Sequence, residues 1–399
     1  MQSARQPDRA NKSAPKVVMI SGTHDYRTPR RGSFQALADA FIRLGYEVSF
    51  ISIRFSPISI VTGDHRRHLW SRINQVEKVN NIQCYLWGTI FHPCHTRLSL
   101  IDKLATPLFS VYARLPARFL DNELRSASFI VLESGLAISL AHRARRLNKQ
   151  ARIIYRASDM LDTIGAHPSL KTELQNRLDD IDAFCLLAQK MARDFTWAAG
   201  KAYVVPLGIN PQDFADIGPS PYSADKNAIT VGSMLFDPEF FQYAARKFPD
   251  VQFHLIGCDH QFAAPSNVHI YKEMPFKDTL PYIKHADFGI AAYRPSRNSE
   301  YLSQSSLKLM QYDYLQIPAV CPDYAVGNSQ NRFGYSPTDR TTIEGAIRLA
   351  MERRPVLHGA SFLNWEHVAE RMLHPEAFSD TAIAAPQADV ERSRPLQAH

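Results

Sequence analysis

The chain has 399 residues, of which 45% are hydrophobic, 11% aromatic and 21% charged. This composition excludes wholly disordered, collagen-like and repeat proteins. The length exceeds that of one ordinary core and favours two domains of about 200 residues each. The formal net charge of +7 favours phosphate-rich partners, such as nucleic acid, an anionic membrane surface or a nucleotide.

The charge is unevenly distributed along the chain. Residues 1–200 contain 28 Lys or Arg and 17 Asp or Glu, a net +11, whereas residues 201–399 contain 18 and 22, a net −4. The first half is therefore expected to meet an anionic surface, and the second half needs a local site to select an anion.

Targeting and cross-linking signals are few. The five cysteines are widely spaced and include no Cys-x-x-Cys pair, which favours a reduced, cytosolic setting over disulfides or zinc. Residues 1–16 lack the apolar region of a signal peptide and predict a disordered basic terminus. The most apolar stretch, Phe129–Leu140, is too short to span a bilayer, so any membrane contact is expected to be peripheral.

Short apolar runs alternate with longer amphipathic stretches, which predicts two consecutive α/β domains with doubly wound parallel sheets. The expected domains are residues 17–208 and 209–356, followed by a helix at 357–378 that returns to the first domain and a disordered tail at 379–399. The expected strands are Val17–Gly22, Glu47–Ile53, Ile82–Trp87, Phe129–Glu133, Arg152–Ala157, Ala183–Ala188, Ala202–Pro206, Ala228–Ser233, Val251–Gly257, Val268–Tyr271, Phe288–Ala292 and Ala319–Cys321.

Amphipathic helices are expected between these strands. The helix at Pro29–Leu44 is expected to hold Pro29 in its first turn, and the helix after Asp237 to be capped by that residue with Pro238 at its first position. Ligands of doubly wound sheets bind beyond the carboxyl ends of the strands, so the cleft between the two domains is the expected site.

The segment Ser305–Asp313 is a candidate anion site. Ser305 or Ser306 is expected to cap a helix whose first turn carries Lys308. Unpaired N–H groups, the positive helix end and a lysine together suit a diphosphate. The alternative is an ordinary capped helix with a solvated lysine.

Two other strand ends carry candidate residues. Gly232 and Ser233 end a strand where a ligand can approach the backbone closely, although no complete Gly-x-Gly-x-x-Gly follows and a tight turn is an equal alternative. Asp159 follows an apolar strand, and a partly desolvated carboxylate there can act as a general base. A simple turn cap is the alternative for Asp159.

Basic segments of the first half suit a phosphate-bearing acceptor or a headgroup surface. One follows the first strand, and another combines arginines with tryptophan; solvated loops are the alternative. The residues are His24, Asp25, Arg27, Arg30, Arg31, Arg66, Arg67 and Trp70. No metal site is predicted, because the proline in His92-Pro93-Cys94-His95 breaks the ligand geometry.

Several strings, in order from Val17 to Pro375, resemble the GumK-type glucuronosyltransferases of xanthan assembly. They include His24–Arg31, Glu133–Gly135, Tyr155–Asp159, Gly232–Phe241, Tyr282–Ala286, Ser305–Asp313 and Ala319–Pro322. The resemblance implies the two-Rossmann-domain GT-B fold and inverting transfer of glucuronic acid from UDP-glucuronate. The acceptor it implies is the mannose of a polyprenyl-diphosphate-linked oligosaccharide, at the cytoplasmic face of the inner membrane.

The resemblance also implies roles for particular residues. Asp159 matches the catalytic base, and Lys308 is expected to stabilise the leaving diphosphate, so that neither a metal nor another cofactor is expected. The donor positions that the family match implies are Met234, Glu273, Met274, Tyr293, Ser306, Leu307, Lys308 and Gln311. Gly232 and Ser233 at the strand end and Ser305 at the helix start are expected to join them. The loop Arg294–Leu302 departs from the family pattern.

Two other classes of protein remain as alternatives to a glycosyltransferase. A UDP-sugar epimerase of the same fold would turn over the donor without an acceptor. A basic nucleic-acid-binding protein would bind DNA or RNA in a salt-sensitive way, but the first half has no recognised nucleic-acid module, and nucleic acid is not expected as a partner.

Overall fold

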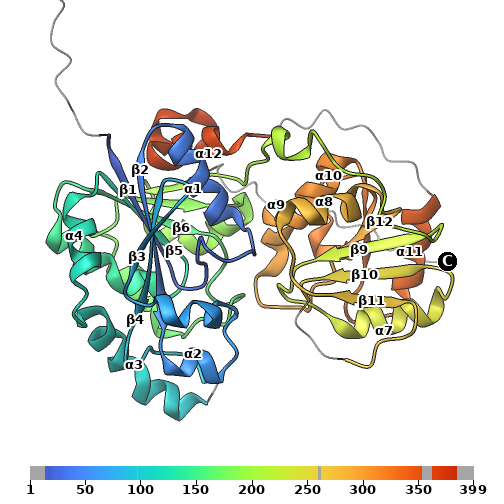
Figure 1. Ribbon diagram of the computed structural model, residues 1–399, viewed down its shortest axis with the longest axis horizontal. Coiled ribbons are helices and arrows are strands. Elements are labelled where there is room, and N and C mark those ends of the chain that lie inside the picture. The colour runs from blue at the N-terminus through green and yellow to red at the C-terminus, as the bar shows by residue number, and fades with distance from the viewer. Residues whose placement is uncertain (1–13, 97, 259–261, 353–361, 384–399) are drawn as a thin grey trace, which may run out of the picture.

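A computed structural model describes residues 14–96, 98–258, 262–352 and 362–383. Two parallel sheets form two α/β units that lie next to each other (Figure 1). The tails expected at 1–16 and 379–399 fall largely outside these residues. At the start of the predicted C-terminal tail, Ser379–Thr381 instead forms a helical turn in which the buried Thr381 donates to the carbonyl oxygen of Pro375 over 2.6 Å.

The first sheet has eight strands in the order β3-β4-β2-β1-β5-β6-β7-β8. All neighbours pair in parallel except β3 and β4. The strands are β1 Lys16–Ser21, β2 Glu47–Phe55, β3 Val76–Val79, β4 Ile82–Gly88, β5 Phe129–Glu133, β6 Arg152–Ala157, β7 Ala183–Leu186 and β8 Ala202–Val204.

Helices cover this sheet, and their buried faces complete the apolar core of the first unit. Helix α1 begins at Ser33 rather than at Pro29, with Gly32 as its N-cap. The helical segments are α1 Ser33–Arg43, α2 Pro57–Val61, η1 His65–Arg72, α3 Ser99–Arg114, α4 Arg118–Ser126, η2 Leu136–Leu140, α5 Ala141–Leu147, α6 Ser169–Asn176 and η3 Gln189–Ala198.

The second sheet has six parallel strands in the order β11-β10-β9-β12-β13-β14. Its strands are β9 Asn227–Val231, β10 Gln252–Ile256, β11 Val268–Tyr271, β12 Phe288–Ile290, β13 Ala319–Pro322 and β14 Arg332–Tyr335. Its helical segments are η4 Pro211–Phe214, α7 Pro238–Lys247, α8 Phe276–Lys284, η5 Ser299–Tyr301, α9 Leu302–Ser305, α10 Leu307–Leu315, η6 Asp323–Ala325 and α11 Thr342–Glu352.

Two predicted details of the second unit are confirmed. Asp237 caps α7 by accepting a hydrogen bond from the Glu239 N–H over 3.1 Å, and Pro238 occupies the first helical position. Ser306 caps α10 through a hydrogen bond from the Leu309 N–H over 3.2 Å. Both caps place a polar helix start beyond the carboxyl end of a strand, which is where a ligand meets this type of sheet.

The end of the chain packs on the first unit. Helix α12, Trp365–Leu373, lies against α1, and the turn η7, Pro375–Ala377, follows it (Figure 1). Gly208 is required where the segment before α12 passes, because a Cβ there would lie 3.1 Å from the carbonyl oxygen of Leu363 and from the Trp365 ring. The chain therefore crosses between the units twice.

Candidate active site

A cleft with a volume of about 260 Å³ lies between the two units, at the carboxyl ends of their strands. All the donor positions expected from the sequence line it, and so does Asp159. The shared lining residues are Asp159, Gly232, Ser233, Met234, Glu273, Met274, Tyr293, Ser305, Ser306, Leu307, Lys308 and Gln311. The structure therefore brings together side chains that the sequence spreads over about 150 positions.

The start of α10 forms a positively polarised wall of the cleft. The Ser306 hydroxyl caps this helix and also bonds the Tyr293 hydroxyl over 2.6 Å. Lys308 donates to the Thr230 hydroxyl over 2.9 Å, and its ammonium group lies 5.6 Å from the centre of the Tyr293 ring. Burial lowers the pKa of Lys308 to about 8. A partly buried cation at a helix start is well suited to bind a phosphate group.

Asp159 lies on the opposite unit, just after β6. Burial raises its pKa to about 7, whereas a hydrogen bond from the Tyr301 hydroxyl over 3.0 Å acts in the lowering direction. The backbone N–H of Asp159 donates to the Ser134 hydroxyl over 3.2 Å. A carboxyl group with a pKa near neutrality can take and release a proton under physiological conditions.

A second carboxylate, Glu133, lies beside Asp159 at the end of β5. It is buried and accepts hydrogen bonds from Ser21 and from Ser158, the latter over 3.3 Å. Its other partner is His24, whose Nδ1 lies 3.1 Å away. Burial lowers the pKa of His24, but the neighbouring Glu133 carboxylate outweighs it and the net direction is upward. His24 is thus paired with Glu133 and not with its chain neighbour Asp25.

Arg30 reaches across the cleft to the second unit. Its guanidinium donates to the Ser233 hydroxyl over 3.1 Å and lies 3.9 Å from the Glu273 carboxylate. Arg31 also lines the cleft, where it is paired with Asp39 and lies over the Tyr26 ring. Arg30 thus contacts two of the expected donor positions, and the role predicted for Arg30 and Arg31, contact with an acceptor or a membrane, stays a prediction.

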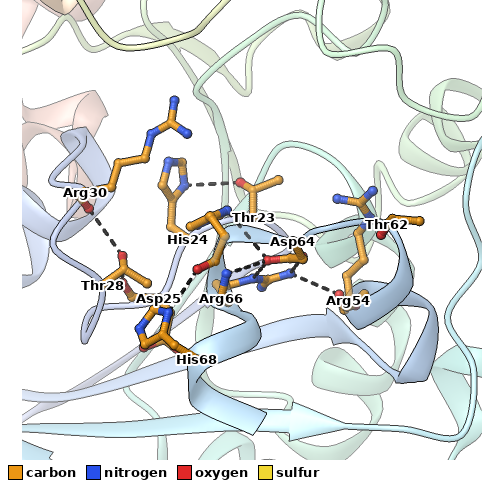
Figure 2. A network of polar contacts seen from close by, with 12 residues as sticks. Thr23, His24, Asp25, Thr28, Arg30, Arg54, Thr62, Asp64, Arg66 and His68 are labelled. Atoms are coloured by element: carbon orange, nitrogen blue, oxygen red, sulfur yellow. Dashed lines mark hydrogen bonds and ion pairs between the residues drawn. The ribbon is translucent and has the colours of Figure 1, made fainter. Parts of the chain in front are cut away.

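Three other residues expected at an acceptor or membrane surface are buried in ion pairs, which corrects that expectation. Asp25 is bound by Arg27 through two contacts of 2.9 and 2.8 Å, and Arg27 also reaches Glu77 over 2.7 Å. Arg66 is fully buried, pairs with Asp64 and donates to backbone carbonyls (Figure 2). Because their charges are already compensated inside the fold, Asp25, Arg27 and Arg66 cannot contact a membrane.

Arg67 and Trp70 are exposed on η1, so their accessibility agrees with the expected surface role. In the segment His92–His95, His92 bonds the Ser56 hydroxyl, and His95 pairs with Asp102. Among the residues that the structure describes, no group of three or more side chains is placed to hold a metal ion.

The sequence did not single out two residues of the site. Tyr301 comes from the loop that departs from the family pattern, and its contact with Asp159 joins the two units. Glu133 was noted only within a family string, although its position at the end of an apolar strand parallels that of Asp159. The contact of Tyr301 depends on how the two units meet, and the contacts of Glu133 depend on partners from neighbouring strands, so local sequence patterns predict neither.

Two largely parallel sheets face a cleft, with a partly buried carboxylate on one wall and a capped helix start with lysine on the other, and this arrangement defines the GT-B architecture. Three solved structures share the fold. These are the trehalose-6-phosphate synthase OtsA (TM-score 0.59, 14% identity, 90% of this chain and 94% of that chain), Anabaena HepE in complex with UDP and glucose (0.53, 11%, 90% and 95%) and the UDP-GlcNAc 2-epimerase of Methanocaldococcus jannaschii (0.52, 11%, 91% and 99%).

Sequence comparison is more specific. Residues 19–187 match the family described as glucuronosyltransferase GumK, N-terminal domain. The UDP-glucuronate:glycolipid 2-beta-glucuronosyltransferase of Xanthomonas campestris pv. campestris is 37% identical over 382 residues, which cover 94% of each chain. The chain therefore belongs to the GumK family of glucuronosyltransferases, as the motifs predicted.

Proposed function

We propose that the protein is an inverting glycosyltransferase that moves glucuronic acid from UDP-glucuronate to a glycolipid in exopolysaccharide assembly. One observation carries the proposal: the partly buried Asp159 and the positively polarised start of α10 lie on the two walls of one cleft. Family membership supports the donor and the acceptor class. The finer acceptor, a mannose on a polyprenyl-diphosphate-linked oligosaccharide, rests on the family resemblance.

The proposed reaction has one displacement step. Asp159 takes the proton of an acceptor hydroxyl, and the freed oxygen attacks the anomeric carbon from the face opposite UDP. The new glycosidic bond forms as the bond from the anomeric carbon to the phosphate oxygen breaks, so the configuration inverts. UDP leaves with the bonding electron pair, and the proton stays on Asp159 until solvent removes it.

Lys308 and the N–H groups at the start of α10 would stabilise the negative charge that develops on the leaving diphosphate. A cationic side chain and backbone N–H donors can stabilise the charge of a leaving diphosphate, so the proposed reaction uses neither a metal nor another cofactor. Tyr293, fixed by its hydrogen bond to Ser306, would shape the cleft next to this group.

The first unit is proposed to dock on a membrane from the cytoplasmic side. No helix in the described residues is both long enough and apolar enough to cross a bilayer. Helix α3 instead exposes an apolar ridge at helical spacing, Leu100, Leu104, Leu108 and Val111, of which Leu100 and Leu104 are 72% and 73% exposed. Exposed basic residues flank it, including Lys103 and Arg114. Such a face suits the headgroup region of an anionic bilayer.

A panel of UDP-sugars tests this proposal. The full-length protein is incubated with each donor, with and without a lipid-linked, mannose-terminated acceptor, and the products are identified by mass and NMR. We expect a glucuronosylated lipid with inverted configuration only from UDP-glucuronate and only with acceptor present. Turnover of the donor without acceptor to an isomeric UDP-sugar would instead establish the epimerase alternative.

A further inference from the structure

Strand β2 is irregular next to its end. Its register with β4 shifts between Ser52 and Phe55, and Arg54 inside the shift has a left-handed backbone with φ of +59°. Bulges of this kind are frequent next to active sites, where they redirect a side chain. A bulky residue with a positive φ is costly and persists only where its surroundings hold it.

The surroundings of Arg54 hold its backbone at both ends. Its N–H donates to the Tyr112 hydroxyl over 3.0 Å, and its carbonyl accepts from Arg66 over 3.0 Å. Arg66 also donates to the carbonyl of Ile53 over 2.9 Å. The buried Arg66 thus clamps the bulge, and Figure 2 shows the guanidinium of Arg54 extending away from the Arg66–Asp64 pair.

The guanidinium of Arg54 has no direct partner among the described residues, although the charge of Asp64 acts on it and raises its pKa against the lowering causes. It is only partly exposed, yet it makes no hydrogen bond or ion pair with any residue that the structure describes. Arg27 and Arg66 are both paired with a carboxylate. Burial and the charge of Arg66 lower the pKa of Arg54. A half-buried guanidinium next to a second cation favours an anionic ligand, and its planar fork matches phosphate oxygens.

Arg54 lines a cavity of about 100 Å³, together with Thr23, His95, Ser134 and Phe109. Two of these residues place the cavity relative to the proposed reaction. Ser134 accepts the N–H of Asp159, and Phe109 belongs to α3, the helix that carries the exposed apolar ridge. The cavity therefore lies between the candidate base and the face proposed to meet the membrane.

We propose that this cavity, through Arg54, binds the phosphate group that joins the acceptor glycan to its lipid anchor. The assignment rests on the proposed function, in which the sugar end of the acceptor reaches Asp159 and its lipid end reaches the membrane. Such an acceptor must extend from Asp159 to the membrane-facing helix α3. The positive charge of Arg54 would pair with the negative charge of its phosphate group.

The test compares two acceptors with the same glycan, one linked to a lipid through a diphosphate and the other a neutral alkyl glycoside. Arg54→Gln is expected to raise the KM for the diphosphate acceptor by about tenfold or more, the loss typical of a charge-assisted hydrogen bond. The KM for UDP-glucuronate and all constants for the neutral acceptor are expected to stay as in the wild type. Arg54→Lys is expected to recover part of the loss.

Arg125→Gln is the matched control, because it removes an exposed arginine from the same unit. Thermal melting and UDP binding show whether each variant is folded. An Arg54→Gln variant that loses activity equally with both acceptors, or with neither, overturns the assignment. Loss of binding to acceptor-free anionic vesicles would also contradict it, because the ligand would then be a phospholipid headgroup.

A direct binding measurement separates this inference from the proposed function. With UDP saturating the donor cleft, inorganic pyrophosphate is added to the wild type and to Arg54→Gln, and binding is followed by calorimetry. We expect binding to the wild type alone, whether or not the protein transfers glucuronic acid in the assay. Equal pyrophosphate binding by both proteins would overturn the inference and leave the proposed function intact.

Discussion

At the scale of single residues, the site depends on two partly buried ionisable groups whose pKa values are displaced by the fold. Burial raises the pKa of Asp159 to about 7 and lowers that of Lys308 to about 8. Both shifts favour the neutral forms of the two side chains. Asp159 is therefore suited to accept a proton, and the charge of Lys308 is suited to pair with a phosphate group. Tyr301 and Glu133 adjust the base in opposite directions, the first by a hydrogen bond and the second by its charge.

The first prediction concerns the pH dependence of turnover. Asp159 must be ionised to accept a proton, so kcat is expected to rise with pH through an apparent pKa of about 7. The Tyr301 hydroxyl stabilises the ionised form, so Tyr301→Phe is expected to move this limb to higher pH. Steady-state rates between pH 5 and 9 measure the shift.

Tyr243→Phe is the control for that experiment, because its hydroxyl bonds Glu344 in the second unit, away from the cleft. It is expected to leave the pH profile unchanged. If Tyr301→Phe lowered the rate at every pH without moving the limb, Tyr301 would have a merely structural role.

A second prediction separates buried from exposed arginines of the first unit. Arg27→Ala leaves the buried Asp25 carboxylate without its partner, and removal of one member of a buried pair costs about 3–5 kcal/mol of unfolding free energy. Arg67→Ala, at an exposed position, is expected to change that free energy by less than about 0.5 kcal/mol. Urea denaturation measures both, and equal losses would contradict the assignment of Arg27 to the core.

At the scale of elements, the loop that departs from the family pattern joins the two units. Residues 297–304 contact the first unit through Arg193 to Glu300 at 2.8 Å, Thr163 to the Arg297 carbonyl at 3.4 Å and Lys190 N–H to Gln304 at 3.2 Å. The Arg193–Glu300 pair is about half exposed, and exposed pairs of this kind contribute little. The partly buried hydrogen bond from Tyr301 to Asp159 is therefore the contact that ties the base to the position of the second unit.

Most strands were predictable because a parallel sheet covered on both faces requires continuous apolar runs, as in Phe129–Glu133 and Arg152–Ala157. The edge strand Val76–Val79 and the strand Arg332–Tyr335 were missed, because both are short and interrupted by polar or exposed positions. The donor residues could be located by motif, since they lie at strand ends and one helix start. The roles of Arg27, Arg54, Arg66 and Tyr301 could not, because each is decided by partners distant in the chain.

At the scale of the whole molecule, the charge asymmetry matches different proposed roles for the two units, membrane docking for the first and donor binding for the second. The half with a net +11 carries the apolar ridge of α3, whereas the half with a net −4 forms a local cationic site with Lys308. Fewer arginines are free for the membrane than the net charge suggests, because Arg27 and Arg66 are paired internally. Docking is therefore expected to combine apolar and electrostatic contributions.

The third prediction tests this combination with vesicles. Leu100→Gln together with Leu104→Gln is expected to weaken sedimentation with anionic vesicles at all salt concentrations, since each leucine side chain contributes about 1.5–3 kcal/mol when fully buried. Binding of the wild type is expected to weaken as the salt concentration rises and to strengthen as the fraction of anionic lipid rises. Leu349→Gln, an exposed leucine of the second unit, is the control, and equal binding by the double variant would refute docking through α3.

The most direct test of the proposed mechanism is the turnover and UDP affinity of Asp159→Asn, measured on the same preparation. The amide keeps the size of the carboxyl group but cannot accept the proton, so kcat is expected to fall roughly 100- to 10,000-fold, the range typical of general-base catalysis. UDP affinity by calorimetry is expected to stay at the wild-type value, because the diphosphate would be held by Lys308 and the start of α10 on the other unit. Near-normal turnover by this variant would contradict the account.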